Sequence, residues 1–114
     1  MTLSVALVGF GWWGQHIARR LKNHPGFDLR MVVEPATGNH AVIREMGLVP
    51  VPRFEEALVD GVTAVILTSP NDQHDTQVAQ AAAAGKHVFC EKPLSLTAAG
   101  ARASVAACHD RGLV

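Results

Sequence analysis

Three glycines near the start of the chain have the spacing G-x-G-x-x-G. They follow an apolar run at residues 3–8, which is typical of a buried strand, and they precede a stretch with helical periodicity. In such a strand–turn–helix unit the first glycine permits a tight turn, the second admits a pyrophosphate close to the backbone, and the third lets the helix pack on the strand. The free N–H groups at the start of the helix point toward the phosphates. The turn therefore predicts a dinucleotide site formed by Gly9, Phe10, Gly11, Trp12, Trp13 and Gly14.

A carboxylate with suitable spacing follows the next expected strand. Glu34 lies directly after residues 27–33 and twenty residues beyond Gly14, where a dinucleotide-binding fold places its ribose-binding acid. A carboxylate accepts hydrogen bonds from the ribose hydroxyls of NAD, and it repels the 2′-phosphate of NADP. Residues 35–37 contain no arginine that could hold such a phosphate. We therefore expect NAD rather than NADP, the alternative being that Glu34 is only a solvated carboxylate at a strand end.

The elements that must position these residues alternate along the chain. Apolar continuity predicts strands at residues 3–8, 27–33, 48–51, 64–67 and 87–90. Helical periodicity and stop signals predict helices at residues 15–21, 39–46, 54–59 and 72–84, with a last one capped by Ser95 or Thr97 and running to about residue 110. This alternation predicts an α/β fold, a doubly wound parallel sheet with helices on both faces, as one domain over residues 1–114. Leu113 and Val114 look like the start of a sixth strand, so we expect the sheet to be truncated there.

Composition excludes several classes of function. With 114 residues, of which 48% are hydrophobic, the chain is large enough to bury a core. Ten basic residues balance ten acidic ones, so we expect no nucleic-acid surface, and no apolar run is long enough to span a membrane. The first strand starts almost at Met1, which leaves no room for a signal peptide. Cys90 and Cys108 show neither metal nor redox spacing, and no histidine set forms a metal site. We therefore expect no metal and a reducing, cytoplasmic compartment.

Two further motifs follow the fourth and fifth expected strands. They are Ser69-Pro70-Asn71-Asp72-Gln73-His74 and Cys90-Glu91-Lys92-Pro93-Leu94. Together with the glycine turn, and in this order, they resemble the N-terminal half of the glucose–fructose oxidoreductase / inositol dehydrogenase / MocA (Gfo/Idh/MocA) family. The resemblance covers essentially the whole chain, and the Glu-Lys-Pro and Pro-Asn-x-x-His motifs are far more specific than the glycines. Threonine is more usual in the family at the position of Ser69, but serine keeps the hydroxyl.

The resemblance implies a Rossmann domain that is followed by a second α/β domain with a large open sheet. It implies hydride transfer between a nicotinamide cofactor and a hydroxyl or carbonyl, most often of a sugar, cyclitol or related polyol. The family's remaining catalytic residues come from the second domain, which is absent from these 114 residues. We therefore expect the chain alone to bind cofactor without efficient catalysis.

The resemblance also assigns roles to residues. It gives Lys92 the catalytic position that reaches the substrate oxygen and the nicotinamide, next to a Lys92–Pro93 bond that the family can hold in the cis form. It implies cofactor contacts for Ser69, Pro70, Asn71, His74, Glu91, Lys92 and Pro93. The residues alone agree with it, because loops after strands one, four and five leave the same edge of a parallel sheet, where ligands bind. A lysine there can polarise a carbonyl or stabilise a developing alkoxide.

Each assignment has a structural alternative. Lys92 could be a surface lysine beside Glu91, His74 could pack at the start of a helix, and Asn71 could cap that helix. Trp13 shares a helix flank with Ile17 and Leu21 and so favours packing, whereas Trp12 could border the cofactor cleft. Cys90, at the end of an apolar strand, is expected to be a buried small hydrophobe.

Two hypotheses concern the chain as a whole. The alternative to a domain of an oxidoreductase is a stand-alone nucleotide-binding or regulatory module, which would use the glycine turn and Glu34 but not Lys92. An unpaired sheet edge and an uncovered apolar face invite association, so we also expect a homo-oligomer.

Overall fold

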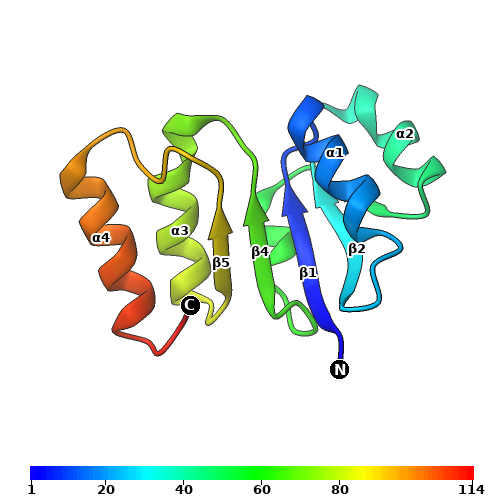
Figure 1. Ribbon diagram of the computed structural model, residues 1–114. Helices are drawn as coiled ribbons and strands as arrows, with labels where there is room; N and C mark the ends of the chain where they lie inside the picture. Colours follow the sequence, from blue (N-terminus) through cyan, green and yellow to red (C-terminus); the bar gives the residue numbers. More distant parts are fainter.

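The computed structural model describes all residues from 1 to 114 and contains one parallel sheet of five strands. Its strand order is β3-β2-β1-β4-β5, so the chain starts in the centre, builds one side, and crosses over to build the other (Figure 1). The strands are β1 (Leu3–Val8), β2 (Phe27–Val33), β3 (Val49–Val51), β4 (Ala64–Leu67) and β5 (His87–Cys90). The predicted α/β fold is confirmed, and four of the five predicted strands have the predicted bounds.

Four α-helices connect or follow the strands: α1 (Trp12–Leu21), α2 (His40–Glu45), α3 (His74–Ala83) and α4 (Ala98–His109). Three short 3-10 helices complete the set: η1 (Thr37–Asn39), η2 (Phe54–Ala57) and η3 (Asn71–Gln73). Thr97 caps α4, because its hydroxyl oxygen accepts a hydrogen bond of 2.9 Å from the N–H of Gly100. Asn71 starts η3 and makes no capping bond, so its alternative role as a helix cap is wrong. None of the helices combines the length and apolar character that a membrane span requires.

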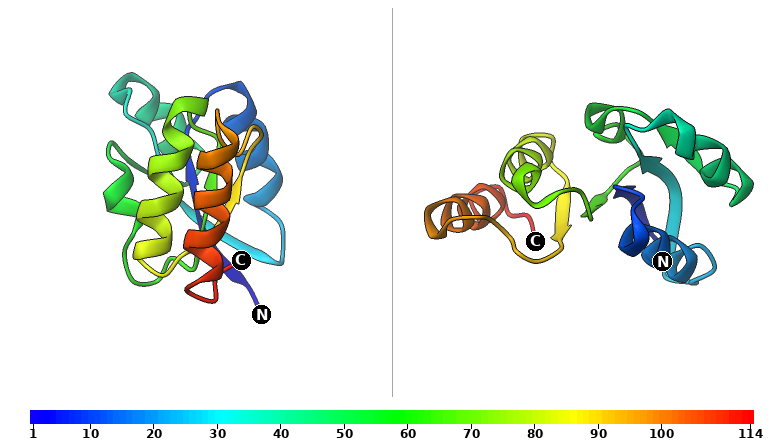
Figure 2. Two further views of the ribbon diagram at one scale, coloured as in Figure 1. Left: turned by 90° about the vertical axis from the view of Figure 1, so that its left-hand side faces the viewer. Right: turned by 90° about the horizontal axis from the view of Figure 1, so that it is seen from above.

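Alternate residues of the central strands supply two separate cores, one on each face of the sheet. One core lies under α1 and α2 and contains Val5, Leu7, Ala18, Ile43, Ala64 and Ile66. The other lies under α3, the end of α4 and η2 and contains Ala6, Val8, Val65, Leu67, Val78 and Ala81. Figure 2 shows the two layers, with α1 on the face opposite α3 and α4. These interdigitated faces fix the register of β1 against β4, because a slip of one residue would exchange the two cores.

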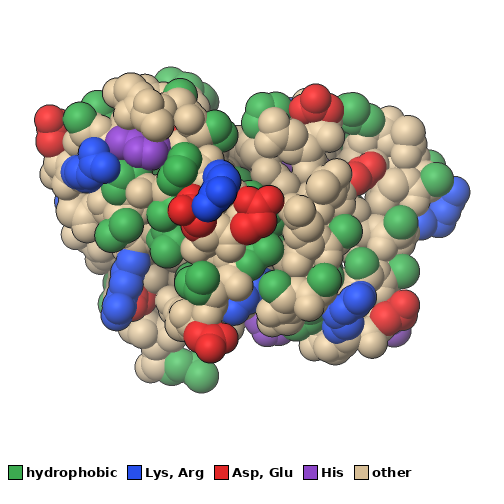
Figure 3. Space-filling model, turned by 180° about the vertical axis from the view of Figure 1, so that it is seen from behind, with side chains coloured by type: hydrophobic (Ala, Val, Ile, Leu, Met, Phe, Trp, Pro, Cys, Tyr) green, Lys and Arg blue, Asp and Glu red, His purple; other side chains and the backbone are tan.

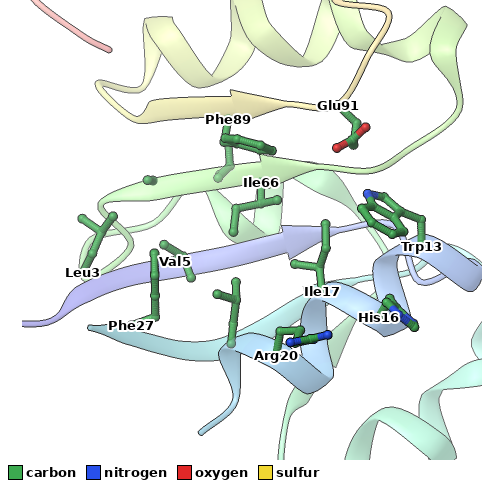
Figure 4. A pocket seen from close by; sticks show the side chains of 13 residues that line it. Leu3, Val5, Trp13, His16, Ile17, Arg20, Phe27, Ile66, Phe89 and Glu91 are labelled. Carbon is green, nitrogen blue, oxygen red and sulfur yellow. The ribbon is translucent and has the colours of Figure 1, made fainter. Parts of the chain in front are cut away.

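Helices cover the two faces unequally. On the face that carries α1, the side chains over β4 and β5 have no helix above them, and Phe89 is 60% exposed. A groove of about 770 Å³ runs there, mostly lined by apolar side chains. Figure 4 shows Trp13 and Glu91 at the end of the groove that meets the carboxyl edge of the sheet, with Leu3 and Phe27 toward the other end. The predicted uncovered apolar face is confirmed.

The last two residues lie at the free edge of β5. The carbonyl oxygen of Val114 accepts a hydrogen bond of 2.9 Å from the N–H of Val88, and the N–H of Val114 donates to Nδ1 of His87 at 3.0 Å. Neither Leu113 nor Val114 forms a regular strand. Their position is nevertheless the one that the sixth strand of a doubly wound sheet occupies, as the sequence predicted.

Candidate functional site

The three glycines of the turn meet different constraints. Gly9 has φ +96°, and a Cβ atom there would lie 2.8 Å from the carbonyl oxygen of Thr68. A Cβ atom on Gly14 would overlap the carbonyl oxygen of Gly9 and lie 2.9 Å from Oγ1 of Thr68. Gly11 has φ −71°, and a Cβ atom there would have no neighbour within 4 Å. The fold therefore requires the first and third glycines, whereas the second leaves its backbone open to a ligand.

The start of α1 provides unused hydrogen-bond donors at this turn. No side chain caps the helix, and its first turn contains no acidic residue. The backbone N–H groups of Trp12, Trp13 and Gly14 donate to no acceptor of the chain. Such a helix end carries a partial positive charge and suits a phosphate group. The chemistry of the turn thus fits a pyrophosphate.

Thr68 joins the loop after β4 to the glycine turn. Its hydroxyl oxygen lies 2.8 Å from the carbonyl oxygen of Val8 and 3.2 Å from that of Gly9. Its N–H also donates to the carbonyl oxygen of Val8, at 2.8 Å. The sequence analysis missed this residue, although a hydroxyl side chain directly before the Ser69-Pro70-Asn71 motif was the available signal.

Glu34 lies at the end of β2 and is held by its neighbours. Its N–H donates to the carbonyl oxygen of Val51 at 2.8 Å, and its own carbonyl oxygen accepts from Nε2 of His40 at 2.7 Å. In the side chain, Oε1 accepts a hydrogen bond of 2.8 Å from Nδ2 of Asn39. No lysine or arginine pairs with the carboxylate, so Oε2 is free to accept from a ligand. Asn39 and His40, which the sequence analysis did not assign to the site, thus orient the predicted ribose-binding acid.

His74 connects the loops that follow β4 and β5. Its side chain is fully buried, with Nε2 3.0 Å from the carbonyl oxygen of Ser69 and Nδ1 2.8 Å from that of Pro93. Both ring nitrogens therefore have partners inside the protein, and the ring offers no free polar atom to a cofactor. Of the two interpretations of His74, the structure favours packing within the protein. The hydroxyl of Ser69 is bonded to Oε1 of Gln77, whereas Pro70 and Asn71 are exposed at the tip of the loop.

Lys92 is exposed at the same edge of the sheet, and the Lys92–Pro93 bond is cis, as the resemblance implied. The N–H of Glu91 donates to the carbonyl oxygen of Leu67 at 3.0 Å, which holds the loop against β4. The carboxylate of Glu91 accepts from the N–H of Lys92 at 3.2 Å rather than pairing with its ammonium group. The Lys92 ammonium makes no ion pair or hydrogen bond within the chain, so it is free to bind a ligand.

The aromatic residues of the turn divide into core and surface. Phe10 is only 3% exposed and belongs to the core under α1, so any cofactor contact of this residue involves its backbone. Trp12 is 75% exposed and Trp13 44%. The rings of Trp12 and Trp13 stack with that of His16 at centroid distances of 5.2 and 5.7 Å, and Trp13 also lines the groove beside Ile17. Trp13 therefore packs on the flank that it was expected to share.

Cys90 differs from its expected state. The residue, at the end of the edge strand β5, is half-buried rather than fully buried. Partial burial is the main cause that raises the pKa of its thiol to about 11, and the negative charges of Glu91 and Asp75 add to it. The neutral thiol thus dominates at physiological pH and is a poor nucleophile.

The edge of the sheet collects these parts in a fixed order. Glu34 follows β2, the glycine turn follows the central β1, and the loops with Ser69 and Lys92 follow β4 and β5. On the opposite side of the molecule from the view of Figure 1, basic and acidic side chains are interspersed and form no single charged patch (Figure 3). The arrangement therefore offers an extended site for a dinucleotide along one edge rather than a broad charged surface.

Known proteins show the same organisation. Residues 3–114 match the family model described as an oxidoreductase family with an NAD-binding Rossmann fold. Inositol 2-dehydrogenase of Acidiphilium cryptum is 39% identical over 106 residues, which are 89% of this chain and 32% of that protein. 2,7-Anhydro-N-acetylneuraminate hydratase of Escherichia coli K12 is 33% identical over 113 residues, which are 97% of this chain and 30% of that protein.

Solved structures agree. GenD2 from gentamicin A biosynthesis, in complex with NAD, superposes with a TM-score of 0.89 at 38% identity over 99% of this chain and 33% of its own. KijD10, a 3-ketoreductase from Actinomadura kijaniata in complex with NADP, gives 0.86 at 26% identity over 100% of this chain and 36% of its own. The chain thus spans about a third of the length of these proteins. It belongs to the Gfo/Idh/MocA family of oxidoreductases and corresponds to their NAD-binding Rossmann domain.

Proposed function

We propose that this chain binds NAD along the carboxyl edge of its sheet, as the cofactor domain of an oxidoreductase that acts on a sugar, cyclitol or related polyol. The observation that carries the proposal is the glycine turn. The fold does not need a glycine at position 11, because a Cβ atom there would meet only open space. Gly11 also lies beside N–H groups at the start of α1 that have no acceptor. Loops from three neighbouring strands meet at this turn.

The residues take the following proposed roles. The turn residues Gly9 to Gly14 hold the pyrophosphate by their backbone, and Glu34 binds the adenosine ribose through its free carboxylate oxygen. The exposed Pro70 and Asn71 with Ser69 border the nicotinamide side together with Glu91, Lys92 and Pro93. The bound nicotinamide would supply hydride chemistry. Lys92 would donate a hydrogen bond to the substrate oxygen and share its proton as charge develops there.

We propose NAD in preference to NADP. Glu34 keeps one carboxylate oxygen without a partner in the chain, and no arginine or lysine neutralises it. A 2′-phosphate would therefore meet a negative charge without a cationic partner. GenD2, which binds NAD, is more similar in sequence to this chain than KijD10, which binds NADP, and this agrees with the proposal.

The chain alone is proposed to bind the cofactor without efficient catalysis. Lys92 is the only catalytic group that the resemblance places in these residues, and it is exposed at the edge of the sheet rather than enclosed in a substrate pocket. A stand-alone binding module remains the second candidate. It would have no use for the unpaired ammonium of Lys92, so the geometry around Lys92 favours the oxidoreductase.

A titration with NADH and NADPH, with tryptophan fluorescence as the readout, tests the proposal. Trp12 and Trp13 lie within the turn, so bound dinucleotide is expected to quench them or to accept energy from them. Saturable binding with NADH preferred would support the proposal, and a folded chain that binds neither dinucleotide would refute it. Robust sugar oxidation by the chain alone would refute the proposed lack of catalysis.

We also propose that the isolated chain self-associates, a second copy covering the groove around Phe89. Exposed apolar side chains over β4 and β5 and the free edge of β5 support this association. A reducing, cytoplasmic compartment is a further proposal, supported by Cys90 and Cys108, which are both free thiols.

A further inference from the structure

We infer that two buried histidines, His40 and His74, are positioning residues that each hold one half of the dinucleotide site. Neither is proposed to touch the cofactor. Each fixes the backbone of a loop that does, His40 on the side of β2 and His74 on the side of β4 and β5. The inference deepens the proposed function and depends on it.

His74 holds the β4 and β5 loops to each other. Its ring is fully buried, and the carbonyl oxygens of Ser69 and Pro93 lie 3.0 and 2.8 Å from its two nitrogens. A carbonyl oxygen only accepts, so a neutral ring donates to one of the two carbonyl oxygens and packs against the other, and both hydrogen bonds form together only when both nitrogens carry a proton. Ser69 is followed by the exposed Pro70 and Asn71, and Pro93 is preceded by the exposed Lys92. A shift of either loop would therefore move the ligand-facing groups of this half.

His40 has the equivalent position on the other side of the turn. The residue is 7% exposed, and its Nε2 donates to the carbonyl oxygen of Glu34 at 2.7 Å. This bond crosses from the first residue of α2 to the end of β2 and fixes the backbone that carries the carboxylate. Asn39, the residue before it, holds the carboxylate itself at 2.8 Å. His40 and Asn39 therefore set the backbone position and the side-chain orientation of Glu34.

The strand order separates the two halves. The glycine turn follows β1 in the centre, Glu34 follows β2 on one side, and Ser69 and Lys92 follow β4 and β5 on the other. A dinucleotide with its pyrophosphate at the turn places one nucleoside on each side. No hydrogen bond connects His40 with the loops of His74. The histidines should thus affect different parts of the same ligand.

Calorimetric titration with NADH and with ADP-ribose, which lacks the nicotinamide, distinguishes the two roles. For His74→Leu we expect unchanged ADP-ribose affinity and an NADH affinity that falls to the ADP-ribose value. For His40→Leu we expect both affinities to fall by the same factor, about tenfold or more. His109→Leu, at an exposed site, serves as the matched control and should change neither.

Conservative variants keep the test valid if a leucine variant fails to fold. His40→Gln retains an N–H donor and should recover most of the affinity for both ligands, and His74→Gln should recover part of the NADH preference. Equal losses of both ligands in the His74 variants, or equal affinities of the wild-type chain for the two ligands, would overturn the inference while leaving the proposed cofactor site intact. A folded wild-type chain that binds neither ligand would overturn the proposed function and the inference with it.

Discussion

We expect alanine at Gly11 to weaken dinucleotide binding while leaving the fold intact. The backbone of Gly11, with φ −71° and ψ −171°, is open to any residue, and the added methyl group would meet no atom within 4 Å. Alanine is a poorer N-cap than glycine, but it also reduces the entropy of the unfolded chain. Because these effects oppose each other, we expect the free energy of unfolding to change by less than about 1 kcal/mol.

The effect on the ligand should be larger. The methyl group of Gly11→Ala would occupy the space through which a pyrophosphate approaches the N–H groups at the start of α1. We expect the dissociation constant for NADH to rise at least about tenfold, which corresponds to about 1.4 kcal/mol. The same increase is expected for ADP-ribose, because both ligands contain the pyrophosphate.

Gly14→Ala is the matched variant with the opposite profile. Its methyl group would overlap the carbonyl oxygen of Gly9 and lie 2.9 Å from Oγ1 of Thr68, and the overlapped oxygen belongs to the backbone, which cannot rotate away. Overpacking of this kind costs about 1–3 kcal/mol. At about 2 kcal/mol the melting temperature of a chain of this size falls by about 8 °C.

Thermal unfolding, monitored by circular dichroism, and titration with NADH test the expected profiles of Gly11→Ala and Gly14→Ala. If Gly11→Ala bound NADH like the wild type, the pyrophosphate would not pass over Gly11 and the assignment of the turn would be wrong. If Gly14→Ala melted at the wild-type temperature, the close approach of α1 to the turn would be wrong. A loss of stability in Gly11→Ala equal to that in Gly14→Ala would refute the division of the glycines into two kinds.

Three further predictions concern other sites. Glu34→Gln should weaken NADH binding and shift the preference toward NADPH, because it removes the charge that repels a 2′-phosphate. Paired titrations measure the ratio of the dissociation constants for NADH and NADPH, and an unchanged ratio would contradict the role of Glu34. In a Cys108→Ala background, Cys90 should react with iodoacetamide more slowly than free cysteine near pH 9.0. Its reaction rate should increase as the pH rises toward its pKa of about 11. Reaction at the rate of free cysteine near pH 9.0 would contradict the raised pKa. Phe89→Asp should reduce self-association by placing a charge in the groove, and light scattering that finds the same mass for both chains would count against the groove as the contact.

Elements with continuous local signals could be predicted from the sequence. The four residues of β4 are all buried, and their uninterrupted apolar run needs no knowledge of the rest of the chain. The same holds for the apolar stripe of α1 that faces the sheet, although this helix starts at Trp12, before the third glycine, rather than at residue 15 as predicted. Where the signals were weaker the bounds moved, as in the helix predicted at residues 39–46, which starts as a 3-10 turn. Short elements depend more on tertiary packing than on local preference.

The contacts that complete the site could not be predicted in this way. Thr68 bonds to Val8, 60 residues earlier, and this pairing depends on the register of β4 against β1. A strand sequence shows which side chains alternate but not which carbonyl lies opposite a given hydroxyl. For the same reason His40 was one histidine among six until β2 and α2 were placed side by side.

Motifs also mix residues that touch a ligand with residues that hold those residues in place. His74 lies in the same motif as Asn71, yet its ring is buried and bonded to two loops, while Asn71 is exposed at the edge. Gly11 and Gly14 likewise share one pattern, although only Gly14 is required by the fold. Sequence spacing alone does not distinguish the two kinds of position. Only the contacts between atoms separate the two kinds: Gly11 and Asn71 are left open to solvent, whereas Gly14 and His74 are enclosed by the protein.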